Sequence, residues 1–180
     1  MIWLRTTWFR LLIRIRGRRV TIGPGLKLKC WLELRGPGQF VFGANCVIDS
    51  MPGGKREHVT LYTNSAAALV RLGDNVMLRA TRMSCKYGIA CGNDVLIEDA
   101  GMADTDFHSI EPGRPDAAEN PELCRIVIGD RAAIGSRCEI CKGVTVGEGA
   151  RIIAGSVVRK SVPPGVTVFG NPARLVAADD

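Results

Sequence analysis

The segment from Ile126 to Val168 reads IVIGDRAAIGSRCEICKGVTVGEGARIIAGSVVRKSVPPGVTV and repeats itself every six residues. Each repeat opens with an aliphatic residue, and a small or branched residue follows four positions later. The opening residues are Ile128, Ile134, Ile140, Val146, Ile152 and Val158, and the later ones are Ala132, Cys138, Val144, Ala150, Ser156 and Val162. A period of six fits neither the roughly 3.6-residue period of a helix nor the alternation of a strand, and short fixed repeats are typical of solenoids. We therefore predict a hexapeptide β-helix.

In such a coil each hexad forms one short strand and one tight turn, so that three hexads close a triangle and stacked coils pair in parallel. The opening aliphatic residue then points into the prism, and the later small residue fits the narrow corner. Turn residues recur at Gly129, Gly135, Gly147 and Gly155, followed in two repeats by an acidic residue. We expect these glycines to allow positive φ angles, and Asp130 and Glu148 to make hydrogen bonds within their turns.

The rest of the chain fits one such domain. Its 180 residues include 21 glycines and only 6% aromatic residues, and the hydrophobic share of 46% is enough for a continuous core. Weaker repeats run through residues 22–48, 72–78 and 91–97, and we assign residues 21–180 to the β-helix with a C-terminal tail. The polar, proline-bearing stretch at 104–125 lacks the repeat, so we predict a loop that protrudes from the prism.

The first 20 residues, MIWLRTTWFRLLIRIRGRRV, form a separate basic amphipathic segment. Arginines interrupt the apolar residues too often for a span of the bilayer, and no small-residue cleavage site of a signal peptide follows. Two interpretations remain open for the short helix predicted here. Residues 1–19 lie in a membrane interface, or the helix packs on the first coil or on a neighbouring subunit.

The net charge and the cysteine content limit which partners and which metal or redox chemistry the chain is expected to have. Net charge is +6, which favours an anionic partner, and no nucleic-acid motif accompanies it. The seven cysteines lie largely at repeat positions, as core residues of a cytoplasmic protein would. Cys138 and Cys141 form a C-x-x-C without a second pair or a histidine cluster, so we predict no metal site.

Two stretches resemble the hexapeptide-repeat O-acetyltransferases of the galactoside, maltose and polysaccharide group. One is Asp104–Ile110, DTDFHSI, and the other comprises Ala154–Pro163, AGSVVRKSVP, with Gly170–Arg174, GNPAR. The resemblance implies a left-handed β-helix, whereas physics alone favours right-handed crossovers between parallel strands. It also implies a homotrimer with active sites between neighbouring prisms.

The resemblance further implies catalysis by His108 as general base, which suits the proton transfer from a sugar hydroxyl that attacks a thioester. Asp106 is the first candidate to orient His108, and Asp104 and Glu111 are others. The expected contacts to acetyl-CoA are Ser136, Ala154, Arg159, Lys160 and Arg174, the last of these at the cofactor phosphates. Many relatives carry an aromatic residue where Ala133 stands, so a stacking contact is not expected here.

The sequence thus predicts an acetyl-CoA-dependent O-acetyltransferase of surface polysaccharide biosynthesis, acting on a sugar or a lipid-linked saccharide in the cytoplasm or at the inner face of the membrane. Two alternatives stay open. The first is N-acetylation of an amino sugar, and the second is a non-catalytic β-helix scaffold. A zinc enzyme of the carbonic anhydrase type is not expected, because its metal site needs three histidines and this chain has only His58 and His108.

Overall fold

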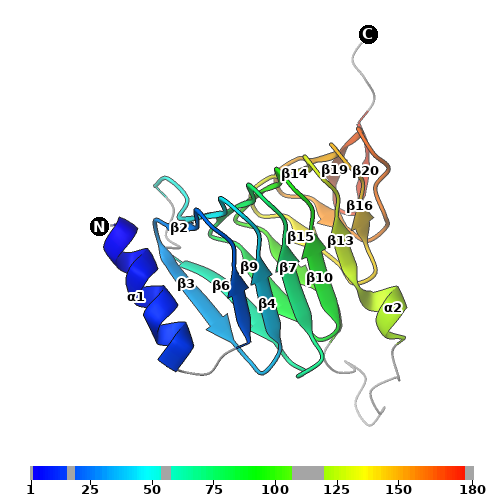
Figure 1. Cartoon of the computed structure of the whole chain (residues 1–180). Coiled ribbons are helices and arrows are strands. Elements are labelled where there is room, and N and C mark those ends of the chain that lie inside the picture. The colour runs from blue at the N-terminus through cyan, green and yellow to red at the C-terminus, as the bar shows by residue number, and fades with distance from the viewer. Residues whose placement is uncertain (1, 16–18, 54–57, 107–119, 177–180) are drawn as a thin grey trace.

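The computed structural model describes residues 2–15, 19–53, 58–106 and 120–176. It is an all-β, left-handed parallel β-helix whose three sheets form the sides of a prism, as the hexad repeat predicts. Helix α1 (Ile2–Ile15) lies across one end of the stack of coils, and the C-terminal strands lie at the other end (Figure 1). The chain adds one strand to the first, second and third sheets in that order, and this sequence repeats in the next coil.

The strands are short because each hexad supplies one side of the prism and also the turn that leads to the next side. The first sheet contains β1 (Val20–Ile22), β4 (Gln39–Phe42), β7 (Leu69–Leu72), β10 (Gly88–Cys91), β13 (Ile126–Ile128) and β16 (Thr145–Val146). The second contains β2 (Lys27–Leu28), β5 (Val47–Asp49), β8 (Met77–Arg79), β11 (Leu96–Glu98), β14 (Ala133–Ile134), β17 (Arg151–Ile152), β19 (Thr167–Gly170) and β20 (Ala173–Leu175). The third contains β3 (Trp31–Arg35), β6 (His58–Thr63), β9 (Arg82–Cys85), β12 (Gly101–Ala103), β15 (Glu139–Ile140) and β18 (Val157–Val158).

The core confirms the hexad assignment of residues 126–168. All twelve opening and corner residues are buried, and none exceeds 6% exposure. Along the second sheet the inward residues stack in register, from Leu28 on Ile48 at one end to Ile152 on Val168 at the other. Burying each such side chain contributes roughly 1.5–3 kcal/mol, so the column is a main source of stability.

The repeat glycines are needed for a reason different from the expected one. Gly155 has φ of +78°, but Gly129, Gly135 and Gly147 do not have positive φ. At Gly129 a Cβ would lie 2.6 Å from the backbone nitrogen of Glu148 in the next coil. These glycines therefore allow neighbouring coils to approach closely. The left-handed conformation falls two residues later, as at Arg131 with φ of +57°.

The carboxylate of Asp130 also acts between coils and not within its own turn. Its Oδ1 accepts a hydrogen bond of 2.8 Å from the backbone N–H of Asn93, whose own Oδ1 accepts one of 2.9 Å from the N–H of Asp74. Asp74 in turn accepts from the N–H of Ala44. One corner of the prism thus carries a ladder of side chains that satisfies backbone donors. Glu148 likewise pairs with Arg131 of the preceding coil.

We expect Gly129→Ala to lower the free energy of unfolding by about 3 kcal/mol, since its methyl group would press on the backbone of the next coil. Gly149→Ala is the matched control, because it has φ of +66° but open space around the added carbon. Its cost should be only about 1 kcal/mol. Denaturant unfolding of both variants measures the difference. Equal costs would show that close stacking is not what Gly129 provides.

Candidate functional site

The chain interrupts its coils at one corner, where the third sheet passes into the first. We call this the insertion corner, and its described residues are 85–87, 104–106, 120–125, 141–144 and 159–162. The predicted loop at 104–125 leaves the prism after β12 and returns through the short helix α2 (Pro121–Cys124). Asn120 caps α2 by accepting a 3.0 Å hydrogen bond from the N–H of Glu122. Both ends of the insertion therefore lie at the same corner.

Both ends are also tied to one turn of the next coil. The Nζ of Lys142 lies 2.5 Å from Oδ2 of Asp106 where the insertion begins. The N–H of Gly143 donates a 2.8 Å hydrogen bond to the carbonyl of Cys124 where it ends. The same turn stacks on the turn of the following coil that carries Arg159 and Lys160. The contact between them is a 3.0 Å hydrogen bond from the N–H of Cys141 to the carbonyl of Val158. The base of the insertion and these cations thus share one corner.

Of the predicted catalytic residues, the structure places Asp106 but not His108. His108 lies outside the described residues, as does Glu111. The Asp106 side chain is 73% exposed and its carboxylate is paired with Lys142. The role of Asp106 as the group that orients His108 stays a prediction, and Lys142 is a partner that the sequence did not indicate.

Asp104 has a structural task instead. Its fully buried carboxylate accepts hydrogen bonds from the backbone N–H groups of Lys86, Tyr87 and Gly88, at 2.7, 2.8 and 2.7 Å. Cys85 donates its thiol proton to the same carboxylate, at 3.5 Å. Burial and this neighbouring charge raise the pKa of the Cys85 thiol. Asp104 thus fixes the turn from β9 to β10 directly below the insertion, and its oxygens are occupied there.

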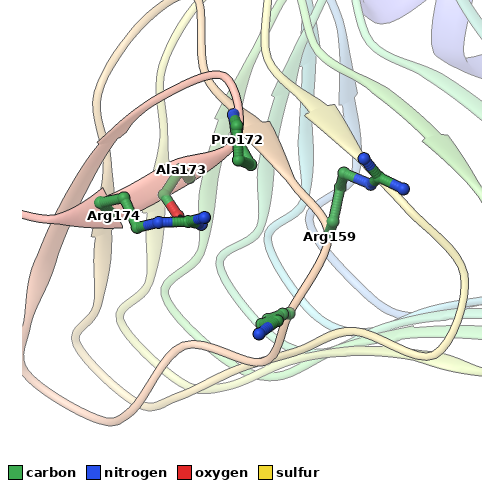
Figure 2. A pocket seen from close by; sticks show the side chains of 5 residues that line it. Arg159, Pro172, Ala173 and Arg174 are labelled. Atoms are coloured by element: carbon green, nitrogen blue, oxygen red, sulfur yellow. The ribbon is translucent and has the colours of Figure 1, made fainter.

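Three of the predicted cofactor contacts come together at the C-terminal end of the prism. Arg159, Lys160 and Arg174 line a hollow of about 220 Å³ together with Pro172 and Ala173. The first two lie in the turn after β18, and the others belong to the β19–β20 hairpin, in which Asn171–Pro172 is a cis peptide bond. Figure 2 shows the Arg174 side chain extending from the hairpin toward the turn, and the Arg159 guanidinium pointing away from the hairpin.

The charge of this hollow is entirely positive. Its lining contains three cationic side chains and no carboxylate. In the parts of the chain that the structure describes, Arg159, Lys160 and Arg174 form no ion pair, and Arg174 donates only to the carbonyl of Ala173, at 3.0 Å. Guanidinium and ammonium groups that line an open hollow without a carboxylate suit an anion with several phosphates.

Ser136 and Ala154 lie elsewhere, at the corner between the second and third sheets. They stack on each other in successive coils, where the carbonyl of Ser136 accepts a 2.8 Å hydrogen bond from the N–H of Gly155. Ser136 is half-buried and Ala154 is exposed. Neither lines the cationic hollow, so the five predicted cofactor contacts fall into two groups, three that line the hollow and two that do not.

Ser156 connects the hairpin to the last coil, a role that its place as a small corner residue did not reveal. Its hydroxyl is fully buried and donates a 2.6 Å hydrogen bond to the carbonyl of Ile153. The same oxygen accepts a 3.2 Å hydrogen bond from the N–H of Gly170. This contact fixes the start of the hairpin that carries Arg174. The sequence signal for this role was a serine at a corner position where most of the other repeats carry an aliphatic residue.

The cysteines are free, and six of the seven are buried. Burial raises the pKa of Cys30 to about 11 and that of Cys91 to about 12, which keeps these thiols protonated at neutral pH. Cys138 and Cys141 of the C-x-x-C lie at two different corners. Within the described ranges no group of three or more His, Cys, Asp or Glu side chains is placed to hold a metal ion.

Comparison with known proteins supports the repeat and the fold. Residues 125–160 match the family described as the hexapeptide repeat of succinyl-transferase. The serine acetyltransferase of Buchnera aphidicola is 30% identical over 118 residues, which cover 65% of this chain and 41% of that protein. The 2,3,4,5-tetrahydropyridine-2,6-dicarboxylate N-acetyltransferase of Clostridium perfringens is 40% identical over 62 residues, which cover 34% and 26%. The chain thus spans less than half the length of the curated relatives it matches.

Among solved structures, AntD from Bacillus cereus is similar in fold. It is an N-acyltransferase, crystallised with dTDP and 3-hydroxybutyryl-CoA. The TM-score is 0.72 at 17% sequence identity, and the match covers 95% of this chain and 88% of AntD. Residues 125–160 thus match a hexapeptide repeat, and the two curated relatives named above are acetyltransferases.

Proposed function

We propose that the protein is an acetyltransferase that uses acetyl-CoA as donor and a sugar as acceptor. The observation that carries this proposal is the cationic hollow formed by Arg159, Lys160 and Arg174. Coenzyme A bears a pyrophosphate and a further phosphate on its ribose, and a lining of three cations without a carboxylate matches that charge. The acetyltransferases among the relatives and the acyl-CoA bound to AntD support the same donor.

The donor would extend from this hollow toward the insertion. Arg174 would bind the phosphates, with Arg159 and Lys160 at the adenine end. Ser136 and Ala154 do not line the hollow, and we expect them to contact the pantetheine arm in a homotrimer, where neighbouring prisms bring their surfaces together. Acetyl-CoA and sugar nucleotides are cytoplasmic metabolites, so we place the reaction in the cytoplasm, within surface polysaccharide biosynthesis.

His108 would act as general base in a direct transfer. It accepts the proton of the acceptor as the acceptor oxygen attacks the thioester carbonyl, and the oxyanion that forms is stabilised by backbone N–H groups of an adjacent coil. Collapse of this intermediate breaks the C–S bond, and the thiolate of coenzyme A takes the proton from the imidazolium. In support, the insertion that contains His108 rises from the turn stacked on Arg159 and Lys160.

N-acetylation of an amino sugar is the second candidate, and the fold of AntD favours it. That enzyme is an N-acyltransferase and has also been crystallised with dTDP-4-amino-4,6-dideoxyglucose. The same base and donor serve both reactions, because an amine and a hydroxyl each lose one proton during attack. A non-catalytic scaffold is the third interpretation, and it gives no reason for a cationic hollow next to the insertion.

We expect Arg174→Ala to weaken binding of acetyl-CoA at least about tenfold in calorimetry, because a charge-assisted hydrogen bond to phosphate is lost. The control is Arg151→Ala, an exposed arginine of the second sheet that does not line the hollow. It should bind acetyl-CoA as the wild type does. A wild-type protein that binds no acetyl-CoA would overturn the proposed donor and leave the scaffold as the better interpretation.

His108→Ala should lower turnover by about two to four orders of magnitude, the usual range for a lost general base, while its oligomeric state is unchanged. The other histidine offers a matched control, since His58 is exposed at the start of β6 and distant in sequence from the insertion. Release of coenzyme A measures both variants against the wild type. Wild-type turnover by His108→Ala would exclude the assignment.

The acceptor group is decided by the product. We expect an ester on a sugar hydroxyl when paired acceptors are supplied that differ only in a hydroxyl or an amino group. Hydroxylamine cleaves an ester under mild conditions and leaves an amide intact, so treatment of the labelled product separates the two. An amide as the main product would replace the first candidate by N-acetylation.

A further inference from the structure

Helix α1 is fixed on the first coil by one of its faces. The hydroxyl of Thr6 accepts a 3.2 Å hydrogen bond from the N–H of Leu28 in β2. Arg5 donates to the carbonyl of Lys29, and its guanidinium lies 5.9 Å from the ring centroid of Trp31. Phe9 is partly buried against the core. These contacts confirm packing on the first coil, and they determine which face of α1 points outward.

The outward face of α1 carries large apolar side chains. Leu4 is 65% exposed, Trp8 58% and Leu11 49%. Their spacing of four and three residues places them in one stripe along the helix. Trp31, 64% exposed, flanks the helix through its contact with Arg5. We call Leu4, Trp8, Leu11 and Trp31 the apolar stripe. Exposing two tryptophans and two leucines to water at one end of a prism marks an interaction site.

The charge around the apolar stripe selects the kind of partner. Residues 1–30 contain eight arginines and lysines and no acidic residue, whereas residues 31–180 contain 16 basic and 18 acidic residues. The whole positive excess of the chain therefore lies in the segment that contains α1. A second copy of the same segment would meet it with like charge, while an anionic surface would attract it.

We propose that the apolar stripe inserts into the headgroup region of an anionic membrane, with α1 parallel to the surface. Tryptophan and leucine on one face of a basic helix are the residues that such interfaces take up. At 14 residues, α1 reaches only about 21 Å, and no helix among the described residues has the length and hydropathy needed to cross a bilayer. Strands β19 and β20 lie at the end of the prism opposite α1 (Figure 1), and the hairpin they form lines the cationic hollow, so the hollow would lie away from the membrane.

Co-sedimentation of the full chain with vesicles tests this proposal. We expect binding to vesicles that contain about one third phosphatidylglycerol, weaker binding to pure phosphatidylcholine, and release as salt screens the charges. The triple variant Leu4→Ser, Trp8→Ser, Leu11→Ser keeps every basic residue and should bind the anionic vesicles at least about tenfold more weakly. Circular dichroism and thermal unfolding check that the variant keeps its fold.

The matched control is Leu123→Ser, Ile153→Ser, Phe169→Ser, which removes two aliphatic side chains and one aromatic from exposed sites outside α1. It should bind vesicles as the wild type does. Equal binding of the two triple variants to anionic vesicles would overturn the proposal. Equal binding of the wild type to anionic and to pure phosphatidylcholine vesicles would also overturn it. Self-association of the wild type that only the α1 variant abolishes, without vesicle binding, would instead assign the apolar stripe to a second copy of the chain.

Discussion

The close stacking of successive coils is the constraint on which the rest of this structure depends. Parallel pairing places every residue directly over its counterpart one coil below. Each side chain must therefore pack against the equivalent side chains of the coils above and below it. Inside, this demands aliphatic residues such as Leu28 and Ile48 at matching positions. At the corners it demands glycine, as at Gly129, where backbone approaches backbone. Interior and corner together set the six-residue period.

A stacked prism leaves two open ends, and the chain closes each of them differently. At the N-terminal end, α1 covers the first coil through Thr6 and Phe9. At the C-terminal end, β19 continues the second sheet and β20 returns antiparallel beside it, with Ser156 holding the start of the hairpin. Both closures contain cationic side chains, so the two ends of the prism are suited to anions, although residues 31–150 between them carry 12 basic and 16 acidic residues.

The sequence alone predicted the interior almost residue by residue, because a period of six leaves a core position little freedom. It failed for contacts between residues far apart in the chain. The carboxylate of Asp104 binds three backbone donors some 16 to 18 residues earlier, and Lys142 meets Asp106 across 36 positions. No local pattern encodes such pairs. The expected cofactor contacts were chosen by resemblance, which named Arg174 and Ser136 together without revealing that only Arg174 lines the hollow.

The anchoring of the insertion has a consequence for how proteins of this design diversify. Asp106 and Cys124 contact the adjacent residues Lys142 and Gly143. These two contacts fix the ends of the insertion on the coils, and they do not depend on the sequence between them. Closing a loop between fixed points becomes only about 0.6 kcal/mol more costly with each doubling of its length. Residues between the anchors can therefore lengthen, shorten or change composition at little cost to the prism. Such changes would leave the cationic hollow at the C-terminal end of the prism as it is.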